Sequence, residues 1–282
     1  MTGMPQPVGF RLAPDSRGQG GAVCLALQQA DVRLGITGQV HALRGIDLRI
    51  GAGERVALVG SNGSGKSTLL RALHGLVPLS AGTSQRPSDL RMAMLFQRPY
   101  LMRLSVLNNI ALGLWLQGVP WRRTGALARE ALQRVGMADL AQRNARALSG
   151  GQVQRLALAR AWALRPSVWL LDEPTASLDP HAKHEVEALI AEFCSDGSGL
   201  ETLPGCALAE SDQADRRLVS HGPTTLVFAS HNLGQVKRLA SRVIYLEQGR
   251  LLVDLPVHAF FNHERLKAVC PSAHLFLQGE SL

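Results

Sequence analysis

The stretch RVALVGSNGSGKSTLLRALHGL, residues 55–76, places a glycine-rich loop between an apolar run and an amphipathic segment. RVALV is short, apolar and rich in valine, which is typical of a buried strand. STLLRALHGL has leucines at helical spacing and a glycine near its end, which is typical of a helix and its C-terminus. The stretch therefore predicts a strand, a tight loop and a helix in direct succession.

The loop itself, GSNGSGKST at residues 60–68, fits the pattern G-x-x-x-x-G-K-S/T, which binds phosphates. Its glycines let the backbone turn tightly, and successive N–H groups with the helix N-terminus attract an anion. A Gly/Ser-rich turn with a chance lysine is the alternative, but the chain has only four lysines and the flanking context is right. We predict that these residues bind a nucleotide: Gly60, Ser61, Asn62, Gly63, Ser64, Gly65, Lys66, Ser67 and Thr68, with Ser67 also a Mg²⁺ ligand.

A second apolar run, VWLLDEP at residues 168–174, ends in two acids. A strand buried on both faces would place these carboxylates at the carboxyl edge of a sheet, beside the phosphate loop. We predict that Asp172 holds Mg²⁺ and that Glu173 polarises the water that attacks a γ-phosphate. Asp-Glu before a proline is also a common turn, so the loop upstream is what favours the catalytic interpretation.

Three further polar residues end or follow predicted strands and helices. Gln97 follows RMAMLF and could contact Mg²⁺ or the attacking water, or could be a surface glutamine. His231 follows TTLVFAS and could bond a γ-phosphate or cap the next helix. Asp179 could contribute to the site or only N-cap a helix that begins at Pro180.

The stretch ALSGGQVQRLALARA, residues 147–161, predicts a second anion-binding helix start. Ser149 is a suitable N-cap, and Gly150 and Gly151 leave the first turn open so that backbone N–H groups face outward. The chain therefore carries two candidate phosphate cradles about ninety residues apart in the sequence.

The order of these motifs resembles that of the ATP-binding subunits of ABC transporters, over residues 22–262. The matching elements are GSNGSGKST with Walker A, Gln97 with the Q-loop, LSGGQ with the signature, LLDEP with Walker B, SLD with the D-loop and His231 with the switch histidine. The resemblance implies an α/β P-loop NTPase fold: a RecA-like core, an antiparallel β-subdomain and an inserted helical subdomain.

The same resemblance implies ATP and Mg²⁺ as cofactors and a dimer that closes head to tail on two ATPs. Ser149, Gly150, Gly151 and Gln152 of one copy would contact the ATP held by Lys66 of the other, and Asp179 is a further nucleotide-binding residue. A homodimer is favoured, and a heterodimer stays open. Hydrolysis would reopen the dimer and move an integral-membrane permease, which would contact residues 97–119 and serve an extracytoplasmic substrate-binding protein.

Only the resemblance of a few sequence stretches indicates the transported substrate. Residues 97–119, 159–180 and 230–251 look most like the ATPases of tungstate importers, with phosphate importers a near second. Other small-anion or amino-acid importers are alternatives. A soluble ABC ATPase acting on DNA or ribosomes and a non-ABC P-loop kinase are alternatives from other classes.

Composition limits the partners. The net charge of +8 and a pI near 10 come from 26 arginines against four lysines. The basic residues are scattered, with no run longer than two, so we predict no nucleic-acid partner. Four widely spaced cysteines do not predict a zinc site or a disulfide scaffold. The start has no signal-peptide core and no window predicts a membrane span, so we expect a soluble, cytoplasmic chain. The resemblance to ABC transporter subunits implies a peripheral position at the cytoplasmic face of the inner membrane.

The chain divides into several predicted parts. Residues 1–21 are predicted to be a disordered tail, and 22–262 one ABC ATPase domain with a helical subdomain at about 98–165. Residues 195–222 form an atypically long polar insertion, and 263–282 a short C-terminal extension. Between residues 22 and 60 there is no Phe, Tyr or Trp to stack on adenine. Ile36, Val40 or His41 would have to pack on the base instead.

Overall fold

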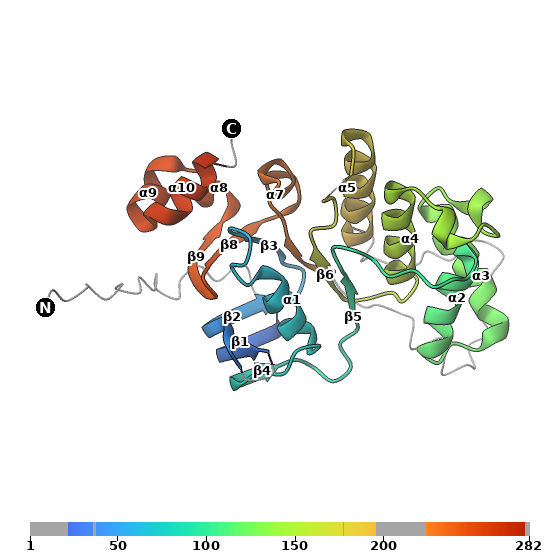
Figure 1. Cartoon of the computed structure of the whole chain (residues 1–282), viewed down its shortest axis with the longest axis horizontal. Helices are drawn as coiled ribbons and strands as arrows, with labels where there is room; N and C mark the ends of the chain where they lie inside the picture. Colours follow the sequence, from blue (N-terminus) through green and yellow to red (C-terminus); the bar gives the residue numbers. More distant parts are fainter. Residues whose placement is uncertain (1–21, 36–37, 177, 196–223, 280–282) are drawn as a thin grey trace, which may run out of the picture.

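A six-stranded sheet runs through the centre of the protein, with a smaller sheet and one helix on one face and most helices on the other (Figure 1). The computed structural model describes residues 22–35, 38–176, 178–195 and 224–279. The predicted tail at 1–21 and nearly all of the predicted insertion at 195–222 lie outside the described residues.

The central sheet has the non-sequential order expected of a doubly wound fold. Its strands, in spatial order, are β5 (Met92–Leu95), β6 (Val168–Asp172), β7 (Thr225–Ala229), β3 (Arg55–Val59), β8 (Arg242–Glu247) and β9 (Arg250–Pro256). All neighbours are parallel except β8 and β9. The carboxyl ends of β3, β6 and β7 therefore reach the same edge, where Ala229 pairs in register with both Leu58 and Asp172.

A second, antiparallel sheet has the order β2–β1–β4, formed by β2 (Val40–Gly51), β1 (Val23–Leu34) and β4 (Ala81–Gln85). The apolar runs VCLALQ and IDLRI, which predict strands, lie in β1 and β2. β4, with the sequence AGTSQ, is exposed throughout and has no apolar alternation, so the sequence did not predict it.

The two faces of the central sheet have separate hydrophobic cores because successive side chains of a strand point to opposite faces. Alternate residues of β3, β6, β7 and β8 pack with α1 (Lys66–His74) and the antiparallel sheet: Val56, Leu58, Leu170, Val227 and Ile244. Their neighbours face the helical layer: Ala57, Trp169, Leu171, Phe228 and Tyr245. The α/β P-loop fold expected from the sequence, with its antiparallel sheet, is confirmed.

Helices occupy most of the stretch for which the sequence predicts a helical subdomain, residues 98–165. They are α2 (Val106–Leu116), α3 (Trp121–Arg134) and α4 (Gly150–Trp162), with 3-10 turns at Ala138–Leu140 and Ala145–Ala147. Glycines lie just beyond the ends of α2 and α3: Gly118 and Gly136 both have positive φ, 88° and 64°. Glycine adopts that backbone region without strain.

The remaining helices are α5 (Pro180–Ser195), α7 (Leu233–Leu239), α8 (Val257–Phe260), α9 (His263–Val269) and α10 (Pro271–Gly279). The last two lie in the predicted C-terminal extension and join the core of the helical face. Leu266, Ala273 and Leu277 are buried, and the Phe276 ring lies 5.5 Å from the Tyr245 ring of β8. No helix within the described part of the chain is long and apolar enough to span a membrane.

Candidate functional site

The loop between β3 and α1 folds so tightly that two of its positions accept only glycine. Gly60 has φ 143°, and a Cβ there would lie 2.1 Å from the carbonyl oxygen of Leu246. Gly65, with φ 106°, directly precedes α1, and a Cβ there would lie 2.8 Å from the carbonyl oxygen of Ala42. Contacts this short are not compatible with any side chain, so the loop path depends on both glycines.

Inside this loop the structure places one buried cation and one buried hydroxyl. Lys66 is 6% exposed, and its Nζ donates to the carbonyl oxygens of Gly60 at 2.7 Å and Ser61 at 3.0 Å. Ser64 is 2% exposed, and among the described residues its Oγ meets no hydrogen-bond partner. Buried polar atoms are normally bonded, so an orphaned hydroxyl beside a lysine fits a site that takes an anion.

Two hard oxygen donors meet beside the loop. Ser67 Oγ, in the first turn of α1, donates to Asp172 Oδ1 at 2.8 Å. Asp172 ends β6 and is 3% exposed. A hydroxyl and a buried carboxylate from adjacent elements are ligands that Mg²⁺ accepts, so the residues present fit this metal.

The three predicted catalytic residues lie together, because Gln97 and His231 both contact the carboxylate of Glu173. Its Oε2 accepts from Gln97 Nε2 at 3.1 Å, and its Oε1 lies 2.8 Å from His231 Nε2. Its backbone has φ 48°, a region that non-glycine residues rarely adopt, and its N–H donates to the carbonyl of Ala229 at 3.1 Å. Such backbone geometry persists only where the surroundings enforce it, and it often occurs at functional sites.

Asp179 caps a helix in this structure. Its Oδ1 accepts from the N–H of Ala182 at 3.0 Å in the first turn of α5. The hydrogen bond from Ala182, with smaller help from the N–H of His181, holds the pKa of Asp179 below its ordinary value. The capping interpretation of Asp179 is thus met, and its contact with a nucleotide stays a prediction.

The second predicted cradle starts α4 with a reciprocal cap. Ser149 Oγ accepts from the N–H of Gln152 at 3.4 Å, and Gln152 Oε1 accepts from the N–H of Ser149 at 3.0 Å. Ser149 and Gly150 are exposed, as an outward-facing site requires. Gly151 has a different role, because a Cβ there would lie 3.2 Å from Ala182 Cβ; its small size lets α4 and α5 approach closely.

One copy of the chain does not bring the two cradles together. In Figure 1, α1 and α4 are separated by β5 and β6, so the loop at 60–68 and the helix start at 149–152 lie apart. Within a single chain, residues 149–152 therefore do not contribute to the phosphate loop at 60–68.

Of the three residues predicted to pack on the adenine base, His41 is held in place by a hydrogen bond. His41 Nε2 lies 2.6 Å from Asp31 Oδ1, and this hydrogen bond is the main reason why the pKa of Asp31 is lowered. Val40 beside it is 60% exposed, and Ile36 lies outside the described residues. Val40 and His41 thus both remain candidates for contact with a base.

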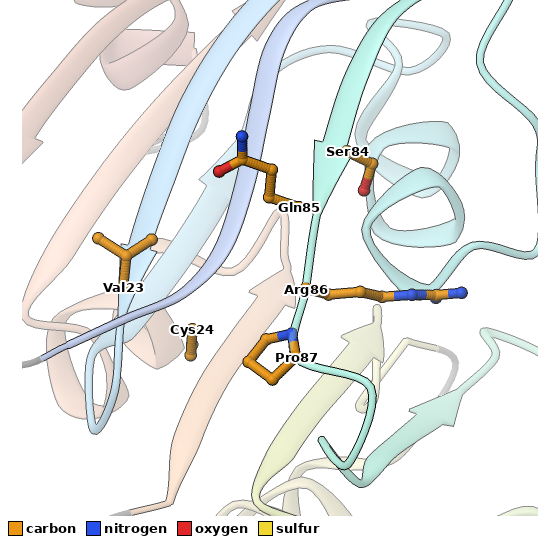
Figure 2. A pocket seen from close by; sticks show the side chains of 6 residues that line it. All are labelled: Val23, Cys24, Ser84, Gln85, Arg86 and Pro87. Atoms are coloured by element: carbon orange, nitrogen blue, oxygen red, sulfur yellow. The ribbon is translucent and has the colours of Figure 1, made fainter.

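A hollow of about 560 Å³ lies elsewhere, between the start of β1 and the end of β4 (Figure 2). Cys24 and Pro87 are among the residues that line it. Arg86, at the same end of β4, extends towards α1 and donates to the carbonyl oxygen of His74. None of the predicted site residues lines this hollow, so it is separate from the phosphate loop.

Comparisons with known proteins agree with the motifs and the fold. The family model described as ABC transporter matches residues 43–176. The chain is 34% identical to the glutamine transport ATP-binding protein GlnQ of Escherichia coli, over 77% of this chain and 86% of that one. It is 36% identical to the phosphonates import ATP-binding protein PhnC of Thiobacillus denitrificans, over 76% and 81%. It is 34% identical to the thiamine import ATP-binding protein ThiQ of a Ruegeria species, over 85% and 95%.

Solved structures show the same fold. A dimeric ATP-binding cassette in a post-hydrolysis state with ADP and Pi superimposes with a TM-score of 0.67 at 24% identity, over 83% of this chain and 98% of that one. A cassette from Clostridium perfringens, part of an ABC transporter complex, gives 0.66 at 24% identity, over 91% and 99%. With its phosphate loop, its paired acids and these relatives, the chain belongs to the ATP-binding subunits of ABC transporters and is an ATPase.

Proposed function

We propose that this chain is the ATP-hydrolysing subunit of an ABC importer, which dimerises on ATP and thereby drives a separate membrane permease. The observation that carries the proposal is the carboxylate of Glu173, which lies 2.8 Å from His231 and 3.1 Å from Gln97. A general base must lie within hydrogen-bond reach of the proton that it accepts, and two polar side chains hold this carboxylate at the edge of the sheet beside the phosphate loop.

In this proposal the residues of the loop bind and orient ATP. Lys66 moves from the carbonyls of Gly60 and Ser61 to the β- and γ-phosphates, and the backbone N–H groups of 60–68 hold the remaining oxygens. Ser67 and Asp172, with Gln97, would hold Mg²⁺. When bound, Mg²⁺ would supply positive charge that offsets the negative charge of the phosphates. Glu173 then orients the attacking water and accepts its proton, and His231 bonds the γ-phosphate.

We further propose that two copies of the chain complete each other's sites. Residues 149–152 and Asp179 of one copy would contact the ATP bound to the other, as the motif resemblance implies. The exposure of Ser149 and Gly150, and the separation of α4 from α1 within one chain, support this arrangement. A structural relative at 24% identity is described as a dimeric ATP-binding cassette, which is consistent with it.

The permease is proposed to contact residues 97–119, and an extracytoplasmic substrate-binding protein to act only through the permease. This stretch exposes large apolar side chains: Tyr100 is 79%, Leu116 68% and Trp115 51% exposed. Large apolar side chains exposed to solvent can mark a contact with another protein. We propose a peripheral position at the cytoplasmic face of the inner membrane, with no nucleic-acid partner.

For the transported solute we propose a small anion. Tungstate is the first candidate because the sequence of residues 97–119 resembles that of tungstate importer ATPases. Phosphate and amino acids are the alternatives, and relatives at 34–36% identity are named for glutamine, phosphonates and thiamine. We expect the substrate-binding protein that serves this permease to bind tungstate far more tightly than phosphate or glutamine. Titration calorimetry of that protein with the three solutes measures this; preferential binding of glutamine or phosphate would contradict the choice of tungstate.

The nucleotide site can be tested with Lys66→Ala. Charge-assisted hydrogen bonds contribute about 1.5–3 kcal/mol each, so we expect affinity for ATP to fall by about 10- to 100-fold. Fluorescence titration with a labelled ATP analogue measures this. Lys267→Ala, which removes an exposed lysine of α9, is the matched control and should bind as the wild type does. Equal affinities in all three proteins would show that the nucleotide binds elsewhere.

A further inference from the structure

Buried hydrogen bonds connect the loop after β6 to the first turn of α7, close to the contact between Glu173 and His231. Gln235 of α7 accepts at Oε1 from Ser230 Oγ at 2.7 Å and donates from Nε2 to Thr175 Oγ1 at 3.2 Å. Gln235 is 0%, Ser230 3% and Thr175 4% exposed. The bonds are therefore shielded from water and join segments 60 residues apart in the sequence.

On one side this network holds the backbone around His231. Ser230 Oγ also accepts from the N–H of Asn232 at 3.0 Å. Asn232 Oδ1 in turn accepts from the N–H of Gln235 at 3.1 Å, which caps α7. Because Ser230 and Asn232 flank His231, the network holds the chain immediately before and immediately after the histidine.

On the other side the network holds the loop that carries Glu173. Thr175 is two residues after Glu173, and the loop turns there, with the N–H of Ala176 donating to the carbonyl of Glu173 at 3.1 Å. Glu173 has φ 48°, a conformation that needs support from its surroundings. The hydrogen bond between Thr175 and Gln235 is one such support.

We propose that Gln235 is a positioning residue for ATP hydrolysis, because its amide holds the Glu173 loop and the His231 turn in register. A primary amide carries an acceptor and two donors at one end, so it bridges two hydroxyl groups without placing a charge in the core. His231 Nε2 then stays 2.8 Å from the carboxylate of Glu173. The inference rests on the roles proposed above for Glu173 and His231.

The test is Gln235→Met, which keeps the length of the side chain but cannot form either hydrogen bond. A misplacement of about 1 Å costs up to about 100-fold in rate, and we expect kcat to fall by about tenfold. The KM for ATP and the affinity for ATP should stay within about twofold, because the phosphate loop is not part of the network. Unchanged kcat, or a loss confined to ATP affinity, would overturn the proposal.

Thr225→Val is the matched control for a loss of stability alone. Thr225 is 1% exposed at the other end of β7, and its Oγ1 accepts from the N–H of Gly53 at 2.9 Å. The Thr225→Val variant therefore loses a buried hydrogen bond that lies away from Glu173 and His231, and its kcat should equal that of the wild type. Thr175→Val removes the same group within the network and should lower kcat; it replaces Gln235→Met if that variant does not fold.

A double variant separates positioning from a general structural effect. If Gln235 acts through His231, then Gln235→Met should lower kcat little further in a His231→Ala background. If the fold-reductions in kcat of the two single variants multiply in full in the double variant, the inference is overturned while the proposed function stays intact. A His231→Ala protein with wild-type kcat would contradict the proposed role of the histidine itself, and the inference with it.

Discussion

Glu173→Gln should lower kcat for ATP hydrolysis by about 10²- to 10⁴-fold, the range that a general base contributes. Glutamine has the same shape and takes the unusual backbone conformation of residue 173 no less readily than glutamate, but it cannot accept a proton. ATP affinity should be unchanged, because Lys66 and the glycines of 60–68 are intact. Steady-state phosphate release and ATP titration measure the two quantities.

The same variant should accumulate as an ATP-bound dimer, since in the proposed mechanism hydrolysis reopens the dimer. Size-exclusion chromatography with ATP should show a species of twice the 30.4 kDa mass of one chain. Glu264→Gln, at an exposed glutamate of α9, is the control and should hydrolyse ATP normally. A Glu173→Gln protein with the wild-type rate would show that another group is the base.

Ser149→Arg should abolish the ATP-dependent dimer and reduce hydrolysis to background, while each monomer still binds ATP. Ser149 is exposed at the start of α4. In the proposed dimer a long cation there would occupy the space of the partner's γ-phosphate and its lysine. The variant also loses the cap to Gln152, which costs about 1 kcal/mol of helix stability. Multi-angle light scattering with and without ATP measures the dimer.

Asn262→Arg controls for the loss of a cap. Asn262 Oδ1 accepts from the N–H of Arg265 at 3.0 Å at the start of α9, and the exchange adds the same arginine far from either cradle. This control should dimerise and hydrolyse ATP as the wild type does. If Ser149→Arg instead lost ATP binding as a monomer, residues 149–152 would serve the site of their own chain.

Local patterns were enough to predict the residues at the sheet edge. A glycine-rich loop after one buried strand and two acids after another reach the same edge of the sheet when the strands are parallel, and Ser67 and Asp172 are in contact there, at 2.8 Å. Gln97 and His231 also reach Glu173, which the order of motifs suggested but no local pattern required.

Features that depend on contacts between distant segments could not be predicted in this way. Gly151 looked like part of an open anion site, and its packing against Ala182 depends on where α5 lies. The extension at 263–282 carries no motif, yet Leu266 and Leu277 complete the core of the helical face. No sequence pattern singles out Gln235, because Thr175 and Ser230 become its neighbours only in the folded chain.

β4 has a consequence for how copies of the protein meet. It is one of the two outer strands of the antiparallel sheet, and all five of its residues, AGTSQ, are exposed. An open edge strand is a template on which other chains can add strands, and apolar side chains make such aggregation worse. β4 has no large apolar residue, so its edge gives little hydrophobic stabilisation to a strand added from another chain. A protein whose copies are proposed to associate only with ATP benefits from an edge that discourages every other association.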